Sequence, residues 1–207
     1  ISHVYEMNDQ TENGIDWIKK SFLPDKWNNF KYHLQWHKAL MSFNSYTNKE
    51  ILNIYDNDVF DIDSEEYLDL INNISLLFRL EILNANVGNR WNDIYNKIKT
   101  RLDDNLLAFI DIHFMICLCF NDIDNAKDYL KNIKKYQDSS NDTYTEIGKT
   151  ITFTLCEAIV SYRTNNFNKC ILILEEVLDK SYLIGGSNAQ RDILNLMLFD
   201  SLLKTKN

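Results

Sequence analysis

The chain alternates between helix-length segments with one apolar face and short polar breaks. Apolar residues recur at intervals of three and four, as in Trp91, Ile94 and Ile98, and this spacing predicts one buried face on an α-helix. The short breaks predict helices that pack as antiparallel pairs. The predicted helices cover about residues 12–22, 30–44, 51–60, 64–86, 89–102, 106–120, 123–136, 144–163, 167–182 and 187–204.

The most apolar of these segments, residues 106–120, is interrupted only by Asp111 and His113. A helix that is apolar on nearly every side is buried on most of them. Buried polar side chains need hydrogen-bonding partners, and residues two positions apart point to opposite sides of a helix. We therefore expect at least one of the two to bond a neighbouring helix.

A tetratricopeptide-like pattern recurs along the chain. It places small or apolar residues where paired helices approach closely, with asparagine at the turn. The best fit uses Ala158, Asn165, Phe167, Cys170, Leu174 and Val177. A second fit runs from Phe114 to Ile133, and weaker ones centre on Gly14 and Ile51. The prediction is an all-α fold, in which antiparallel helix pairs stack as a right-handed superhelix, an α-solenoid with a concave face.

Composition supports a single helical-repeat domain over residues 1–207. The chain is 45% hydrophobic, with one proline and five glycines among 207 residues, which leaves few places for linkers or for a strand-rich fold. It begins with HVYEM, which reads as the tail of a helix. We therefore expect the chain to be the C-terminal part of a longer protein.

The net charge and the cysteines indicate which partners and which cellular compartment to expect. A formal net charge of -8 without a basic stripe predicts no nucleic-acid binding, and no segment is apolar enough to predict a membrane partner. All four cysteines, at positions 117, 119, 156 and 170, fall in apolar helical segments. Buried free thiols are typical of a reducing compartment, so we predict a cytoplasmic protein.

His33 and His37 are four residues apart and share a helix face, a spacing that can hold a metal ion. The glutamate of an HExxH motif is absent, however, and Gln35 lies between the two histidines. An aromatic–histidine face packed with Trp36 explains the pattern better. We therefore predict no metal, no cofactor and no catalytic residue, since no signature of a serine or cysteine nucleophile is present either.

The stretch Gly185-Gly186-Ser187 can be interpreted in two ways. Its amides could hold a phosphate or carboxylate at a helix start. Because no strand precedes the glycines, as a phosphate-binding fingerprint requires, we favour a glycine C-cap followed by a capping box between Ser187 and Gln190.

Two predicted helices also carry polar stripes, which a solvated face explains equally well; for Arg79 we favour a structural ion pair. The stripes are Asn72, Ser75 and Arg79, and Asn188, Arg191, Asp192 and Asn195.

Several short motifs, in order, resemble the C-terminal part of the tetratricopeptide repeat protein 38 family. They are EM and GI at residues 6–7 and 14–15, WHKAL at 36–40, SLLFRLEI at 75–82, VGNRW at 87–91, DIHF at 111–114, LCEAIV at 155–160 and IGGSNAQRD at 184–192. The last is the most specific. Departures are NDQTEN before Gly14 and Asn188 in place of an aspartate or histidine. The resemblance implies a soluble helical-repeat fold and no particular activity.

Two functions follow as hypotheses. The first is a scaffold that binds a peptide or protein partner on its concave face, without catalysis. The alternative is a pocket that binds or turns over a small molecule. The residues of that pocket are His37, Arg79, Asp111, His113, Arg191 and Asp192, and Gln190 completes the set of candidate ligand-binding residues.

Overall fold

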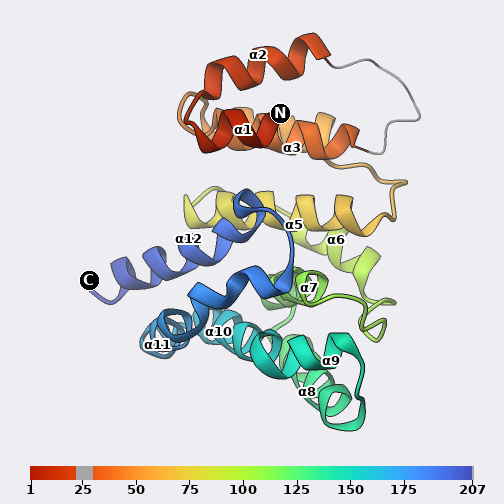
Figure 1. The fold of residues 1–207 in the computed structure, drawn as a ribbon. Helices are drawn as coiled ribbons and strands as arrows, with labels where there is room; N and C mark the ends of the chain where they lie inside the picture. The colour runs from red at the N-terminus through yellow and green to blue at the C-terminus, as the bar shows by residue number, and fades with distance from the viewer. Residues whose placement is uncertain (22–29, 207) are drawn as a thin grey trace. The chain divides into compact units, whose positions relative to one another are not determined.

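The computed structural model describes residues 1–21 and 30–206, which form helices, turns and connecting segments without a β-strand (Figure 1). The all-α prediction is confirmed. Contacts divide the chain into an N-terminal unit, Ile1–Val87, and a C-terminal unit, Gly88–Asn207. The organisation of residues 1–207 as one repeat domain stays a prediction. Within the described residues, no helix combines the length and the apolar character needed to cross a lipid bilayer.

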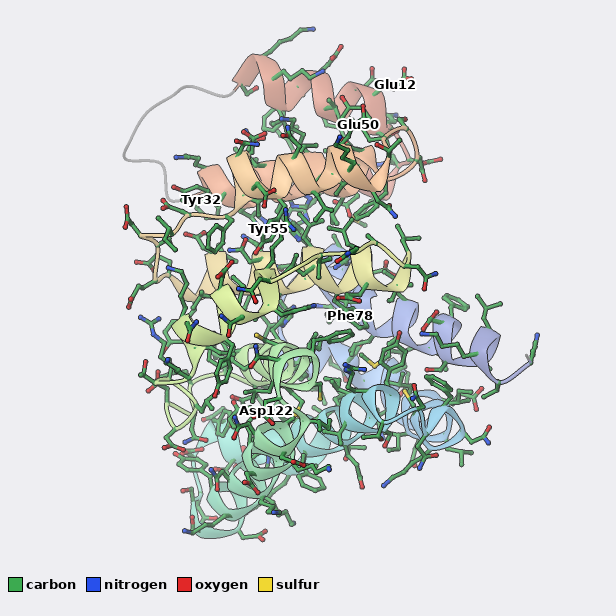
Figure 2. All side chains as sticks on the ribbon, turned by 180° about the vertical axis from the view of Figure 1, so that it is seen from behind. Glu12, Tyr32, Glu50, Tyr55, Phe78 and Asp122 are labelled. Atoms are coloured by element: carbon green, nitrogen blue, oxygen red, sulfur yellow. The ribbon has the colours of Figure 1, made fainter. Side chains whose placement is uncertain are left out.

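The N-terminal unit is built around α3, which packs against α1, α2, α4, α5 and the π-helical turn η1. Its core contains Trp36 and Tyr55, both almost fully buried; Figure 2 labels Tyr55. A capping box between Thr47 and Glu50 starts α4. The elements of this unit are α1 (Ser2–Met7), α2 (Thr11–Ser21), α3 (Lys31–Ser42), α4 (Asn48–Ile54), η1 (Tyr55–Val59) and α5 (Tyr67–Ile82).

The C-terminal unit is built around α7 and α10. Helix α7 packs against α6, α8 and α10, and α10 also packs against α8 and α11. Every residue of α7 from Ala108 to Cys119 is buried, as the apolar pattern predicted. The elements are α6 (Arg90–Ile98), α7 (Ala108–Asn121), α8 (Ile123–Ser139), α9 (Thr143–Ile147), the π-helical turn η2 (Gly148–Thr152), α10 (Phe153–Arg163), α11 (Phe167–Val177), the 3-10 helix η3 (Leu178–Ile184) and α12 (Asn188–Lys204).

The strongest repeat match forms a helical hairpin of α10 and α11. Asn165 takes a left-handed conformation, φ 59°, and the amides of residues 165 and 166 donate to the carbonyls of residues 162 and 161 at 3.1 and 2.9 Å. This pattern is a Schellman motif, which ends α10. The Asn166 side chain then caps α11. The stacking of such hairpins as a superhelix stays a prediction.

The α7–α8 hairpin has a different break. Asp122 alone separates the two helices, and one of its carboxylate oxygens accepts hydrogen bonds from the amides of residues 124 and 125 at 3.0 and 3.2 Å (Figure 2). Aspartate is a strong N-cap because it satisfies amides that have no partner within the helix. The polar break therefore supplies the cap of the next helix.

Several predicted helix boundaries are wrong. The helix predicted over 64–86 is α5, which begins only at Tyr67; Ser64 lies before it, and its hydroxyl donates to Asp69 at 2.6 Å. It ends before Asn84, whose backbone is left-handed. Helix α8 continues to Ser139, beyond the predicted end at 136, and the helix predicted over 167–182 turns into a 3-10 helix at Leu178. The predicted helix end near Phe22 lies outside the described residues.

Asn165 provides a test of the Schellman motif that ends α10. We expect Asn165→Ala to lower the free energy of unfolding by about 1 kcal/mol, because a Cβ without a compensating polar side chain is strained at positive φ. Asn165→Gly should leave stability unchanged or raise it slightly, because glycine accepts this conformation without strain. Urea unfolding followed by circular dichroism measures both. Equal losses for the two variants would contradict the Schellman assignment.

Candidate functional site

The seven predicted site residues are divided between the two units. His37 and Arg79 lie in the N-terminal unit, on α3 and α5, and the other five lie in the C-terminal unit, on α7 and α12. Their convergence on one pocket stays a prediction. Within each unit, however, their neighbours are defined.

In the N-terminal unit, His37 and Arg79 both lie against the buried ring of Trp36. The guanidinium carbon of Arg79 lies 5.7 Å from the centroid of that ring, and the His37 ring lies 4.8 Å from it at an angle of 68°. The arginine also donates to the carbonyl of Ser75 at 3.1 Å and to its hydroxyl. Arg79 is thus held by its own helix and by an aromatic face on α3.

The predicted aromatic–histidine face of α3 is confirmed. His33 stacks on Trp36 with ring centroids 5.3 Å apart and an interplanar angle of 14°. A third histidine, His3 of α1, joins this face. Its ring centroid lies 4.2 Å from that of His37 and 5.7 Å from that of His33, and its Nε2 lies 3.3 Å from Nε2 of His37. Three imidazoles from two helices therefore meet within the N-terminal unit.

Hydrogen bonds orient two of these imidazoles. Nδ1 of His37 lies 2.6 Å from a carboxylate oxygen of Glu6, and Nδ1 of His33 lies 3.2 Å from the amide oxygen of Asn72. Because an amide oxygen only accepts, Nδ1 of His33 carries the proton. Burial, together with the proximity of His37, lowers the pKa of His33 to about 4. His33 is therefore neutral at pH 7 and keeps a lone pair on Nε2.

His3 was missed because it lies thirty residues before the motif on α3, in a segment interpreted only as a helix tail. The available signal was the spacing of His3 and Glu6. Residues three apart share one helix face, so an imidazole and a carboxylate point together from the short helix α1. No periodicity in the sequence indicates which later helix packs against that face of α1.

In the C-terminal unit, Asp111 joins three helices. Its carboxylate accepts from the hydroxyl of Tyr129 on α8 at 2.8 Å and from the hydroxyl of Tyr144 on α9. The prediction that a polar residue of α7 bonds a neighbouring helix is confirmed. Burial raises the pKa of Asp111 to about 6, against the opposing effect of the two tyrosine hydrogen bonds. Asp111 therefore has a structural role with an electrostatic cost.

His113 and the glycine turn both contact Phe109. Nδ1 of His113 donates to the Phe109 carbonyl at 2.7 Å, and a Cβ at Gly186 would lie 2.7 Å from the Phe109 ring. Both glycines have positive φ, 88° at Gly185 and 75° at Gly186. Glycine is needed at position 186 for its backbone conformation and for its approach to α7.

The turn itself is a cap. Ser187 and Gln190 form the predicted capping box of α12. Arg191 donates to the carbonyls of both glycines, at 3.2 Å for Gly185, and Asp192 accepts from the Asn195 amide at 3.2 Å. The structural interpretation of IGGSNAQRD is confirmed, and its polar side chains serve the turn and the helix that follows.

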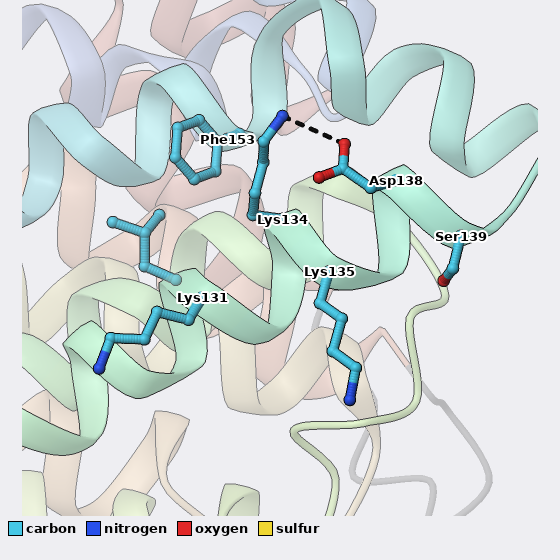
Figure 3. Close-up of a pocket in the computed structure, with 7 residues that line it drawn as sticks. Lys131, Lys134, Lys135, Asp138, Ser139 and Phe153 are labelled. Carbon is cyan, nitrogen blue, oxygen red and sulfur yellow. Dashed lines mark ion pairs between the residues drawn. The ribbon is translucent and has the colours of Figure 1, made fainter.

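A groove that sequence reasoning missed lies along α8 (Figure 3). It has a volume of about 630 Å³, with Leu130 and Phe153 among its lining residues. Lys131, Lys134 and Lys135 also line it. Their spacing on one helix was the available signal, in a chain for which no basic stripe was predicted. The other lining residues are Asp138 and Ser139.

The chain matches no model of a known protein family, and no solved structure matches it. The resemblance to the tetratricopeptide repeat protein 38 family therefore stays a prediction.

Asp111 predicts a pH dependence of stability. Its folded pKa of about 6 exceeds the ordinary 3.8, so between these values the folded chain holds a proton that the unfolded chain has released. Wild-type stability should therefore fall as pH rises from about 4 to 6.5, by about 2 kcal/mol relative to Asp111→Asn, which cannot ionise. Guanidinium unfolding at both pH values measures this difference.

The control for this experiment is Asp179→Asn, which removes an exposed carboxylate from the same unit. It should follow the wild type at both pH values. Parallel pH profiles for wild type and Asp111→Asn would mean that Asp111 is ionised at no cost in the folded chain.

Proposed function

We propose that the chain is a tetratricopeptide-like scaffold that binds a peptide or protein partner. The observation that carries the proposal is the groove on α8, which lysine side chains line together with apolar ones (Figure 3). Such a groove suits a partner segment with an acidic residue next to an aromatic or aliphatic one, because the apolar floor buries the second while the lysines attract the first.

The lysines of the groove can accept a ligand carboxylate at little cost. Lys131 and Lys134 form exposed ion pairs with Asp128 and Asp138 at 2.7 and 3.2 Å, and such pairs contribute only about 0–1 kcal/mol each. Lys135 makes no ion pair with any described residue. Since the chain as a whole carries a charge of -8, this cluster of lysines would stand out as a docking point for acidic segments.

The helical hairpins support the scaffold class. In the α7–α8 and α10–α11 hairpins, polar residues form the caps and turns. The apolar positions of the repeat pattern, such as Ala126, Ala158 and Leu174, are buried. This division is typical of repeat units that stack. The four cysteines are free and buried, which supports the proposed cytoplasmic location.

We favour the scaffold over the small-molecule pocket for a specific reason. Asp111, Arg191 and Asp192 each bond to neighbouring groups of the C-terminal unit. A ligand that engaged them would have to replace these bonds, and at Asp111, which is buried, a polar group left without a partner costs free energy.

The proposal predicts the outcome of a peptide selection. A random peptide library displayed on phage and selected on the purified chain should yield sequences with an acidic residue beside an aromatic or aliphatic one. A synthetic peptide from this pool should bind about 3- to 150-fold more weakly to the triple variant Lys131→Gln, Lys134→Gln, Lys135→Gln, because up to three charge pairs of about 0.2–1 kcal/mol each are lost. Fluorescence anisotropy measures the affinities.

The matched control is Lys127→Gln, which removes an exposed lysine from the same helix outside the groove. Its affinity for the peptide should equal that of the wild type. A selection without enrichment of acidic residues, or a triple variant that binds as tightly as Lys127→Gln, would contradict the proposed groove.

A further inference from the structure

We propose that His3, His33 and His37 bind a divalent transition-metal ion, Zn²⁺ above all, through their imidazole nitrogens. This inference is independent of the peptide groove, because the three histidines lie in the N-terminal unit and the groove in the C-terminal unit. One ligand atom from each histidine can be chosen so that all lie within 4.8 Å of one another. The sequence had favoured aromatic packing for His33 and His37, and the structure adds the third ligand.

The separation of the nitrogens suits a metal ion. Two ligands at about 2.0–2.1 Å from a tetrahedral Zn²⁺ lie roughly 3.3 Å from each other. The Nε2 atoms of His3 and His37 are 3.3 Å apart. The third nitrogen, that of His33, lies at most 4.8 Å from the others, and a side-chain shift of about 1–2 Å is enough to bring the three to the spacing of metal ligands.

In His33 and His37, Nδ1 takes part in a hydrogen bond, which leaves Nε2 for the metal. Metal-binding histidines commonly donate their second nitrogen to a carboxylate or carbonyl, which orients the ring and makes the ligand more basic. Glu6 supplies a carboxylate to His37 at 2.6 Å, and Asn72 supplies an amide oxygen to His33 at 3.2 Å. Two of the three imidazoles are therefore oriented with Nε2 available for coordination.

The chemistry of the donors selects the ion. Imidazole nitrogen suits Zn²⁺ and its neighbours in the first transition row, whereas Mg²⁺ and Ca²⁺ require oxygen ligands. The carboxylate of Glu6 offsets part of the ion's charge.

Access is consistent with a binding site. His37 is fully buried and His33 is 8% exposed, while His3 is partly exposed at the edge of the cluster. An ion can enter beside His3, and three histidines leave a fourth position for water. The ion would also join α1 to α3, so binding should stabilise this unit.

The test uses tag-free protein stripped of metal with a chelator. Zn²⁺ titration by calorimetry should show one site per chain, and Co²⁺ should give visible absorption bands of low-symmetry nitrogen coordination without a thiolate charge-transfer band. His3 is partly exposed, so its replacement by a smaller residue leaves no buried cavity. We expect His3→Ala to bind Zn²⁺ at least a hundredfold more weakly than the wild type. Glu6→Gln, which keeps a hydrogen-bond acceptor, should weaken binding about tenfold or more.

The control is His113→Gln, since His113 is the only other histidine of the chain and lies in the C-terminal unit. It should bind Zn²⁺ like the wild type. Melting temperature gives a second readout: Zn²⁺ should raise it for wild type and His113→Gln and leave it unchanged for His3→Ala. Failure to bind Zn²⁺ or Co²⁺, equal binding by His3→Ala, or a thiolate band would overturn the proposal.

Discussion

The burial of α7 is the constraint on which the C-terminal unit depends. From Ala108 to Cys119 this helix has no side that can face water, and each large apolar side chain removed from water contributes about 1.5–3 kcal/mol. Neighbouring helices must therefore surround it, and α6, α8 and α10 do so. Since the positions of α8 and α10 follow from this requirement, so does the groove on α8, which takes its residues from those two helices.

The two units handle buried polar groups in different ways. In the C-terminal unit, Asp111 is surrounded by apolar residues and bonds two tyrosines that reach it from separate helices. It fixes the positions of those helices at the cost of a raised pKa. In the N-terminal unit, the polar side chains of α3 bond one another and α1, as His37 does with Glu6. In the C-terminal unit the hydrogen bonds serve one carboxylate, whereas in the N-terminal unit several imidazole nitrogens lie close together.

Much of the fold could be predicted because it depends on local patterns. The helices follow from apolar spacing, and the capping boxes at Thr47 and Ser187 follow from residues three apart. Helix ends were less accessible, because α5 begins late, where the Ser64 hydroxyl bonds Asp69, and ends early, before the left-handed Asn84. The partners of Asp111 could not be named, since any buried hydroxyl would satisfy the same requirement. His3 was missed because tertiary packing alone brings it to α3.

The shortness of α1 makes its contacts with α3 decisive. An isolated helix of six residues is unstable in water, because nucleation is not repaid by so few hydrogen bonds, and the Ile1 side chain provides no cap. What holds α1 is its packing against α2 and α3 and the polar pairs that Glu6 and His3 form with His37. The residues that would coordinate and orient a metal ion are thus the same ones that place α1. A helix with so little stability of its own can adjust to an ion at small cost, whereas α3, with its buried Trp36, supplies the rigid side of the cluster.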